Sequence, residues 1–135
     1  MENHNKEDIQ QVIIINKNLN MPCEKIAVQV ARASLLSFLE YSERTQNSIL
    51  LEYRREEPQE RWINTDSKII VLYVKSEETL FNVFKKARER GLPSVLVQDL
   101  GYTFFKEPTY TAVGIGPVYK KDLEGITNRL QTLKY

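Results

Sequence analysis

A run of four β-branched residues, Val12-Ile13-Ile14-Ile15, constrains the fold of this chain more than any other feature. Strands that are covered on both faces are continuously apolar, whereas strands with one face in water alternate apolar and polar residues. The run therefore predicts a central strand in a sheet. The 135 residues suit one domain, and we predict a flexible N-terminal tail over residues 1–10 and a single domain over residues 11–135.

A long first helix is predicted after this strand. Pro22 suits a first helical turn, and a stripe of small and apolar residues continues without an internal Gly or Pro to about Arg44. The segment 45–67 is harder to assign, because its apolar start could begin a short helix but its charged stretch is broken by Pro58. We interpret this segment as a surface connection.

Residues 68–98 have the pattern of a β-α-β unit. Ser76 is a good N-cap for the helix, and Gly91 followed by Pro93 ends it in the usual order. The flanking strands, 68–74 and 94–98, are expected to be parallel and joined by a right-handed crossover.

The last part of the chain predicts one more strand and one more helix. Tyr110 to Ile115 has the composition of a strand, closed by Gly116-Pro117, and a helix from about Lys120 would place its leucines and isoleucine on one side. The predicted fold class is α/β, a four-stranded mixed sheet with helices on both faces in the order β-α-(α)-β-α-β-β-α.

Ligands in such folds gather at the carboxyl ends of strands, which are the segments after Ile15 and after Gln98. After Gln98 the chain has a carboxylate at Asp99, a glycine at Gly101 that permits a close backbone approach, and a hydroxyl at Thr103. Asp and Gly are also ordinary turn residues, so this pattern alone fits a structural turn as well as a site.

The first helix offers a second group of candidates. Lys25, Gln29 and Arg32 are spaced i, i+4 and i+7, so they share one stripe near the start of the helix. Such residues often serve solubility, but here the assembled sheet would bring them close to Asp99. The two groups therefore predict one site.

Several other classes of protein fit poorly. The only histidine, His4, is in the polar tail, so a Ser/His or Cys/His pair cannot be built. Gly114-Ile115-Gly116-Pro117 lacks the spacing of a phosphate loop, and the single cysteine, Cys23, is interpreted as a plain thiol. Short apolar runs and a polar start favour a cytoplasmic protein without a membrane span.

Four motifs together resemble the type II peptidyl-tRNA hydrolases of archaea and eukaryotes. The resemblance covers about residues 11–133, except for part of the 45–67 connection, and the motifs have the order and spacing of that family. The four motifs are Lys25-Ile26-Ala27-Val28-Gln29-Val30-Ala31-Arg32-Ala33, Ser76-Glu77-Glu78 through to Gly91-Leu92-Pro93, Gln98-Asp99-Leu100-Gly101-Tyr102-Thr103, and Thr111 with Ala112-Val113-Gly114-Ile115-Gly116-Pro117.

The resemblance implies hydrolysis of the ester that joins a peptide to the 3′ ribose of tRNA, with no metal or cofactor. It also implies that the active site consists of Lys25, Gln29, Asp99, Thr103 and Thr111. Such a set suits attack by water, because Asp99 could orient or deprotonate water, alone or through Thr103. Lys25 could stabilise the oxyanion or a nearby phosphate.

The sequence departs from the family pattern around this site. Asn18 replaces an aspartate, Pro22 and Glu24 replace glycines, and Arg32 replaces a histidine, so Arg32 keeps a donor that cannot titrate. The alternative to an active hydrolase is a catalytically impaired relative that binds tRNA or a protein partner. A hydrolase for a different ester or amide is the third hypothesis.

Basic and aromatic residues carry the remaining expectations. By the resemblance, the candidate substrate-binding residues are Arg32 and Gly101 in the site and, as contacts to the tRNA backbone, Lys85, Lys86, Arg88 and Lys106. Such basic runs are otherwise a solvated helix face. A homodimer is also possible from sequence, since Phe104, Phe105 and Tyr110 fit an interface as well as a core.

Overall fold

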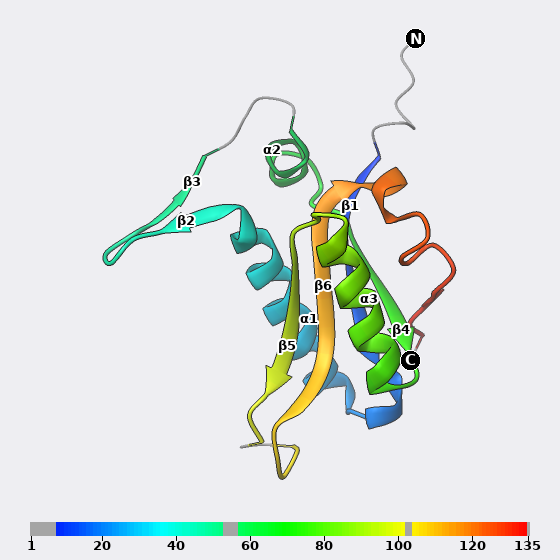
Figure 1. Cartoon of the computed structure of the whole chain (residues 1–135). Helices are drawn as coiled ribbons and strands as arrows, with labels where there is room; N and C mark the ends of the chain where they lie inside the picture. The colour runs from blue at the N-terminus through cyan, green and yellow to red at the C-terminus, as the bar shows by residue number, and fades with distance from the viewer. Residues whose placement is uncertain (1–7, 53–56, 102–103, 135) are drawn as a thin grey trace.

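The structure is a computed structural model that describes residues 8–52, 57–101 and 104–134 (Figure 1). Within these residues the strands and α-helices follow one another as β1 (Ile9–Asn16), α1 (Cys23–Phe38), β2 (Ser42–Arg44), β3 (Ile49–Leu51), α2 (Pro58–Ile63), β4 (Ile69–Val74), α3 (Glu77–Glu89), β5 (Ser94–Asp99), β6 (Thr109–Tyr119) and β7 (Gln131–Thr132). Short 3₁₀ helices lie at Lys17–Leu19, Leu39–Tyr41 and Lys120–Leu123. β1 thus begins before residue 11, where we had placed the start of the domain; residues 1–7 of the predicted tail lie outside the described residues.

The main sheet is mixed and has the strand order β5-β6-β1-β4-β7. β1 is its central strand, parallel to β4 and antiparallel to β6, which confirms the interpretation of the Val12–Ile15 run. The sheet has five strands where four were predicted, because the two-residue β7 pairs with the outer side of β4. The predicted α/β class with a mixed sheet is otherwise confirmed.

The segment 68–98 forms the predicted strand-helix-strand unit, but its strands are not neighbours. β5 is antiparallel to β6, and β6 is antiparallel to β1, so β5 runs in the same direction as β4. β6 and β1 lie between them. Most of β6 is buried, which suits a place inside the sheet, whereas half of the residues of β5 are only half-buried, which suits an edge strand.

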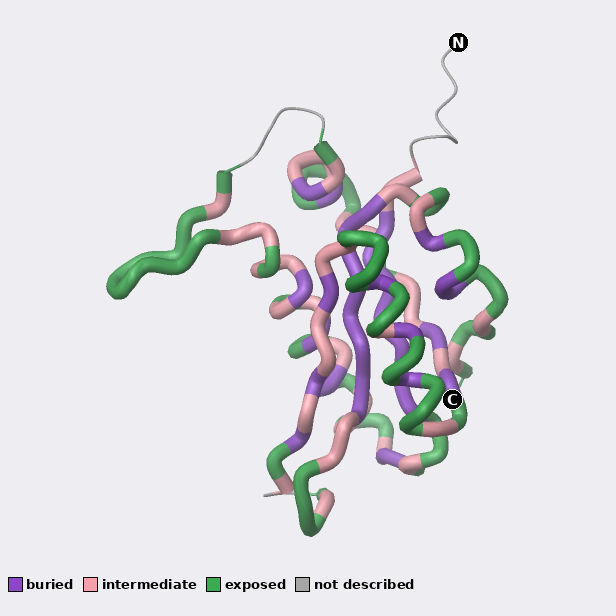
Figure 2. The backbone as a smooth tube through the Cα atoms, viewed as in Figure 1, coloured by how far each residue is buried: buried purple, intermediate pink, exposed green. Residues whose placement is uncertain are grey.

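Helices cover both faces of the sheet, and each face has its own core (Figures 1 and 2). On one face, Leu80, Val83 and Ala87 of α3 pack against residues such as Val12 and Ile14. On the other face, α1 packs through Ala33 against Ile13 and Ile15. Alternate residues of β1 therefore serve opposite cores, as the period of a strand requires.

α1 approaches β6 closely because Gly114 has no side chain. A Cβ atom at Gly114 would lie 2.6 Å from the backbone oxygen of Ala33, which is closer than atoms can approach. The glycine that we had assigned to a structural role from sequence therefore sets the distance between α1 and the sheet. This contact holds the start of α1 near the strand ends.

The first helix is shorter than predicted. It ends at Phe38 rather than near Arg44, because Ser42–Arg44 pairs antiparallel with Ile49–Leu51 as a hairpin that projects from the domain (Figure 1). The 45–67 connection also contains α2, in which Trp62 is buried and donates a hydrogen bond to the Lys68 carbonyl at 2.8 Å. Among the described residues no helix is long and apolar enough to cross a membrane.

Two predictions about the C-terminal part were wrong. β6 does not end before Gly116-Pro117 but runs to Tyr119, because a register shift in its pairing with β1 accommodates these residues. Residues after Lys120 form a 3₁₀ helix and turns rather than an α-helix. Gly125 has a φ of +81° there, outside the helical range, and its N–H is held by the Asn128 side chain at 2.8 Å.

Candidate active site

The start of α1 and the end of β5 meet at the edge of the sheet where β1, β4 and β5 end. The Lys25 amine donates to the Asp99 carboxylate, with 2.6 Å between Nζ and Oδ2. Both side chains are mostly buried, at 14% and 11% exposure, so the pair is only partly open to water. The convergence of helix stripe and strand end that we predicted from spacing is therefore present for these two residues.

The second oxygen of the Asp99 carboxylate is held by the backbone. The Gly101 N–H donates to Asp99 Oδ1 at 2.8 Å, in a turn where Gly101 has a φ of +90°. A Cβ atom at Gly101 would lie 2.8 Å from the backbone of Glu107, so a side chain does not fit at this position. Gly101 therefore fixes the carboxylate from the side opposite to Lys25.

These contacts lower the pKa of Asp99 below its ordinary value. The hydrogen bond from Lys25 is the largest cause, and burial of the carboxyl acts against it. The Gly101 N–H and the positive charges of Lys25 and Arg32 lower the pKa further. Asp99 is therefore ionised at neutral pH, and a weakly basic carboxylate of this kind orients water better than it removes a proton.

Arg32 lies two helical turns beyond Lys25 and is exposed. Its guanidinium donates to the backbone carbonyl of Gln98, with 3.3 Å between Nη1 and the oxygen. This contact joins α1 to β5 next to the carboxylate. A side chain at this position thus both braces the strand end and adds positive charge near Asp99.

Gln29 and Thr111 form a separate contact under the helix. The Thr111 hydroxyl donates to Gln29 Oε1 at 2.6 Å, and the two residues are 0% and 1% exposed. The register between β5 and β6 shifts at Val97 and Gln98, which leaves Thr111 without a partner on β5. Such bulges redirect a side chain, and here the hydroxyl reaches α1.

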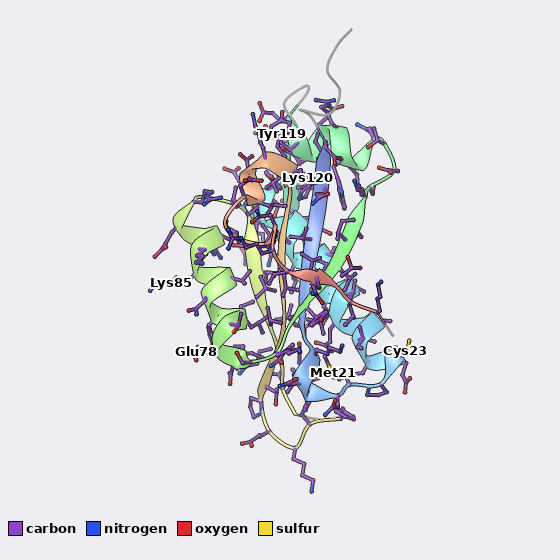
Figure 3. All side chains as sticks on the ribbon, turned by 90° about the vertical axis from the view of Figure 1, so that its right-hand side faces the viewer. Met21, Cys23, Glu78, Lys85, Tyr119 and Lys120 are labelled. Carbon is purple, nitrogen blue, oxygen red and sulfur yellow. The ribbon has the colours of Figure 1, made fainter. Side chains whose placement is uncertain are left out.

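The other predicted site residues are distributed unevenly. Thr103 lies outside the described residues. Lys106 is exposed on the loop that follows Asp99. Lys85, Lys86 and Arg88 are exposed on α3, which covers the face of the sheet opposite to α1 (Figures 1 and 3).

Arg88 is also tied to another part of the molecule. Its guanidinium lies 3.4 Å from the carboxylate of Glu40, which follows the C-terminal end of α1. Lys25 and Glu40 are therefore separated by the length of α1, which at 1.5 Å per residue is roughly 22 Å. The structure does not bring Arg88 to the Lys25–Asp99 pair.

The positions that depart from the resembling family lie around the pair and form none of the side-chain contacts between Lys25 and Asp99 described above. Asn18 is exposed in the 3₁₀ turn after β1, and Pro22 is the N-cap of α1, where its carbonyl accepts the N–H groups of Lys25 and Ile26. Glu24 is exposed in the first turn of α1, where a negative charge is favourable. The pair of Lys25 and Asp99 is complete in the presence of these residues.

One residue at this edge was missed from sequence. Asn16 closes β1 and is 5% exposed, and its Oδ1 accepts the N–H of Asn18 at 3.2 Å. The signal that could have found it is an amide that directly follows the four β-branched residues. The described residues contain no group of three or more His, Cys, Asp or Glu side chains placed to hold a metal ion.

Comparison with known proteins gives a consistent family. Residues 9–133 match the family model described as Peptidyl-tRNA hydrolase PTH2. A protein of Methanopyrus kandleri named Peptidyl-tRNA hydrolase is 35% identical over 93% of this chain and 98% of its own length. Proteins with the same name from Sulfolobus acidocaldarius and Methanococcus maripaludis are each 33% identical, over 93% and 92% of this chain and 100% and 98% of their own lengths.

Proposed function

This chain belongs to the peptidyl-tRNA hydrolase PTH2 family, and we propose that it hydrolyses the ester of peptidyl-tRNA at the Lys25–Asp99 pair. The products are free tRNA and the peptide. The observation that carries the assignment of the site is the 2.6 Å contact between Lys25 and Asp99 at the carboxyl ends of the strands. Ligands of α/β sheets bind at this edge.

The proposed reaction is attack by water on the ester carbonyl. The ionised Asp99 accepts a hydrogen bond from the water and orients it towards the carbonyl carbon. The Lys25 ammonium stabilises the negative charge that develops on the carbonyl oxygen, or an adjacent phosphate of the substrate. The bond to the 3′ oxygen then breaks. One proton of the attacking water passes to the 3′ oxygen, which becomes the ribose hydroxyl, and the other is released to solvent, which leaves the peptide as a carboxylate.

The remaining residues of the site are assigned positioning roles. Gly101 holds the second oxygen of Asp99, and Arg32 braces the end of β5 through the Gln98 carbonyl. Gln29 and Thr111 are too deeply buried to touch a substrate in this conformation, so they act by fixing α1 on β6. This arrangement sets the direction in which Lys25 points.

The completeness of the pair favours an active hydrolase over an impaired relative that only binds. Asn18 and Glu24 are exposed, and Arg32 keeps a hydrogen bond to the strand end. The direct test is to incubate the protein with a peptidyl-tRNA and measure release of tRNA. Asp99→Ala is expected to lower the rate by about 10²-fold to 10⁴-fold, the usual contribution of a positioned catalytic group.

The matched control is Asp66→Ala, which removes an exposed carboxylate from the turn before β4. It should leave the rate unchanged. Equal, slow release by wild type and Asp99→Ala would sink the assignment of the site. Salt-sensitive binding of tRNA without turnover would instead support the impaired relative.

The exposed cations Lys85, Lys86, Arg88 and Lys106 are proposed as contacts to the tRNA backbone. A tRNA is much larger than the domain, so contacts on both faces of the sheet are compatible with one substrate. Charge reversal at these positions should raise KM more than it lowers kcat, because the contacts are equally strong in the ground and transition states. An unchanged KM would indicate that these residues do not contact the substrate and only form a solvated surface.

The proposal also includes a cellular location and an oligomeric state. We place the activity in the cytosol, where translation produces peptidyl-tRNA. A homodimer remains a prediction: Phe104 is 47% exposed and stacks edge-on against Phe105, whereas Tyr110 is half-buried against Phe81. Sedimentation of wild type and Phe104→Ser tests it, since loss of a dimer in the variant is expected and a monomeric wild type would contradict it.

A further inference from the structure

A groove lies at the same end of the sheet as the Lys25–Asp99 pair, towards the β4 side. It consists of two pockets of about 270 Å³ and 460 Å³ that share Lys17 and Lys134 in their walls. We call these two pockets together the edge groove. β5, which ends in Asp99, and β4 are three strand spacings apart, or about 14 Å. Figure 3 faces this side of the molecule, with Met21 near its lower end.

The smaller pocket of the edge groove has an apolar floor. The floor is formed by side chains of β1, of the loop after it, of α1 and of the C-terminal segment, namely Ile15, Met21, Ile26 and Leu133. The C-terminal segment is fixed there, because the Leu133 N–H donates to the Val71 carbonyl at 2.9 Å. A flat apolar group of a ligand fits such a slot.

Asn16 supplies a hydrogen-bond donor to this slot. It is 5% exposed, and its carboxamide oxygen is occupied by the Asn18 N–H. Its amide nitrogen has no protein partner within residues 8–52, 57–101 and 104–134, although it lines the pocket. This nitrogen is open to the pocket, so it is placed to donate to an acceptor on a ligand that enters it.

The charged side chains that line the edge groove, among the described residues, are both lysines. Lys17 and Lys134 are exposed, no described carboxylate lines either pocket, and neither lysine forms an ion pair with another described residue. The Lys17 ammonium is held 4.5 Å from the centre of the Tyr73 ring, and the Tyr73 hydroxyl donates to Gln131 at 2.8 Å. The Lys17 ammonium is thus oriented by the ring of Tyr73 on β4, and that ring is held by its hydrogen bond to Gln131 on β7.

We propose that the edge groove binds a nucleotide of the single-stranded 3′ end of tRNA. Its phosphates would contact Lys17 and Lys134, and its base would enter the apolar slot, where Asn16 donates to an acceptor on the base edge. Single-stranded RNA is recognised in this way, by burial of an unstacked base and hydrogen bonds to its edges, with cations on the backbone. A peptide without acidic residues would leave both lysines unmatched.

This inference rests on the proposed function, because the ester at Lys25 and Asp99 defines where the 3′ end begins. The apolar slot lies at the end of β1, two strand spacings or about 10 Å from β5, and the short unpaired end of a tRNA is long enough to span this distance. The edge groove then explains how the hydrolase grips the part of its substrate that all tRNAs share. It adds to the backbone contacts proposed on α3.

The test measures binding of a fluorescent RNA oligonucleotide that ends in CCA with a free 3′ hydroxyl. The probe has no ester, so its binding does not depend on hydrolysis. Lys17→Ser with Lys134→Ser is expected to weaken binding about tenfold at low salt. The slope of log Kd against log salt should fall by about 1.4, since each phosphate contact on a single strand contributes about 0.7.

The matched control is Lys120→Ser with Lys121→Ser, at the opposite end of the sheet (Figure 3). It removes the same charge, and Lys121 also lies over a tyrosine ring, that of Tyr119. It should leave Kd and the salt slope unchanged. An equal loss in both double variants would overturn the proposal, because it would show attraction by net charge alone.

A second probe, which lacks the bases of the last three nucleotides, tests the apolar slot. It should bind wild type more weakly than the intact probe, and this difference should disappear in Ile26→Phe, which fills the slot. Equal binding of the two probes to wild type contradicts a base site. The two proposals are separated by their assays: the effect of Asp99→Ala on tRNA release tests the hydrolysis, and binding of the ester-free probe to the lysine variants tests the groove, so either proposal can fail alone.

Discussion

Two groups of polar side chains lie between α1 and the sheet, at opposite ends of the helix, and they differ in charge. The charged cluster, at the start of α1, consists of Lys25, Asp99, Gly101 and Arg32. The neutral cluster, towards its end, consists of Gln11, Ser34, Ser37 and Tyr41 with the carbonyl groups of Gly116 and Pro117.

The neutral cluster is closed. Gln11 is 0% exposed, and its amide donates to the Ser34 and Gly116 carbonyls at 3.0 and 3.3 Å. Ser37 donates to the Gly116 carbonyl at 2.7 Å, and Tyr41 to the Pro117 carbonyl at 2.6 Å. Burial, followed by the charges of Glu57 and Asp122, raises the pKa of Tyr41, so its hydroxyl remains a donor. These bonds are all internal.

The comparison shows what distinguishes a structural polar group from a reactive one under the same helix. In the neutral cluster, side-chain hydrogen bonds pair the carbonyl groups that lie at the register shift between β1 and β6, and these bonds stabilise the fold. The charged cluster holds an ionised carboxylate at the rim, where a substrate can reach it. Variants in the first should change stability, and variants in the second should change activity.

The largest effect is expected for Lys25→Met. Loss of the ammonium should lower kcat/KM by about 10²-fold to 10³-fold, because the charge stabilises the developing oxyanion. Rates are measured at a temperature where circular dichroism shows the variant to be folded. Lys120→Met, which removes an exposed lysine far from the site, is the control and should behave as wild type. A Lys25→Met rate within threefold of wild type would remove Lys25 from the chemistry.

The next effect is expected for Gln11→Leu in the neutral cluster. The Ser34 hydroxyl loses its acceptor, and the Ser34 and Gly116 carbonyls lose the Gln11 donor, although Gly116 keeps Ser37. This loss should lower the free energy of unfolding by about 2–3 kcal/mol. Urea denaturation measures this loss, with Gln46→Leu, at the exposed tip of the hairpin, as control. The rate per folded molecule should stay that of wild type. A large loss of activity at full stability would erase the distinction between the clusters.

Thr111→Val tests the contact that lies between the two clusters. The buried Gln29 oxygen loses its donor, so unfolding should become easier by about 1–2 kcal/mol. If Gln29 and Thr111 position α1, kcat should fall several-fold while KM changes little, and Thr111→Ser should restore kcat because it keeps the hydroxyl. If kcat stays unchanged in folded Thr111→Val, the hydrogen bond between Thr111 and Gln29 has only a structural role.

The smallest effect concerns pH. The folded pKa of Asp99 is below its unfolded value of about 3.9, so this group adds stability above that pH and loses it as pH falls through the folded pKa. The difference in unfolding free energy between wild type and Asp99→Asn should therefore shrink below about pH 4. Gln11→Leu should show a constant difference over the same range, measured by urea denaturation from pH 3 to 7. A constant difference for Asp99→Asn would contradict the lowered pKa.

Much of the framework could be predicted because it depends on local patterns. The β-branched run marked β1, and Ser76 caps α3 as expected, with its hydroxyl accepting the Thr79 N–H at 3.0 Å. The meeting of Lys25 with Asp99 followed from a helix stripe and a strand end. The failures, at the end of α1 and after Lys120, lie where helix-compatible residues pair with another strand or flank a glycine in the left-handed region.

The sequence by itself determined the central strand, the two covered faces and the edge of the sheet at which we propose the site, because apolar periodicity and capping act within one element. Only the tertiary structure decided which side chains meet across elements. Lys25 and Gln29 share one helix stripe, yet Lys25 reaches Asp99 at the rim and Gln29 is buried on Thr111. That difference comes from the register shift in β6 and the close approach at Gly114, which are set by packing between distant segments and leave no periodic signal in the chain.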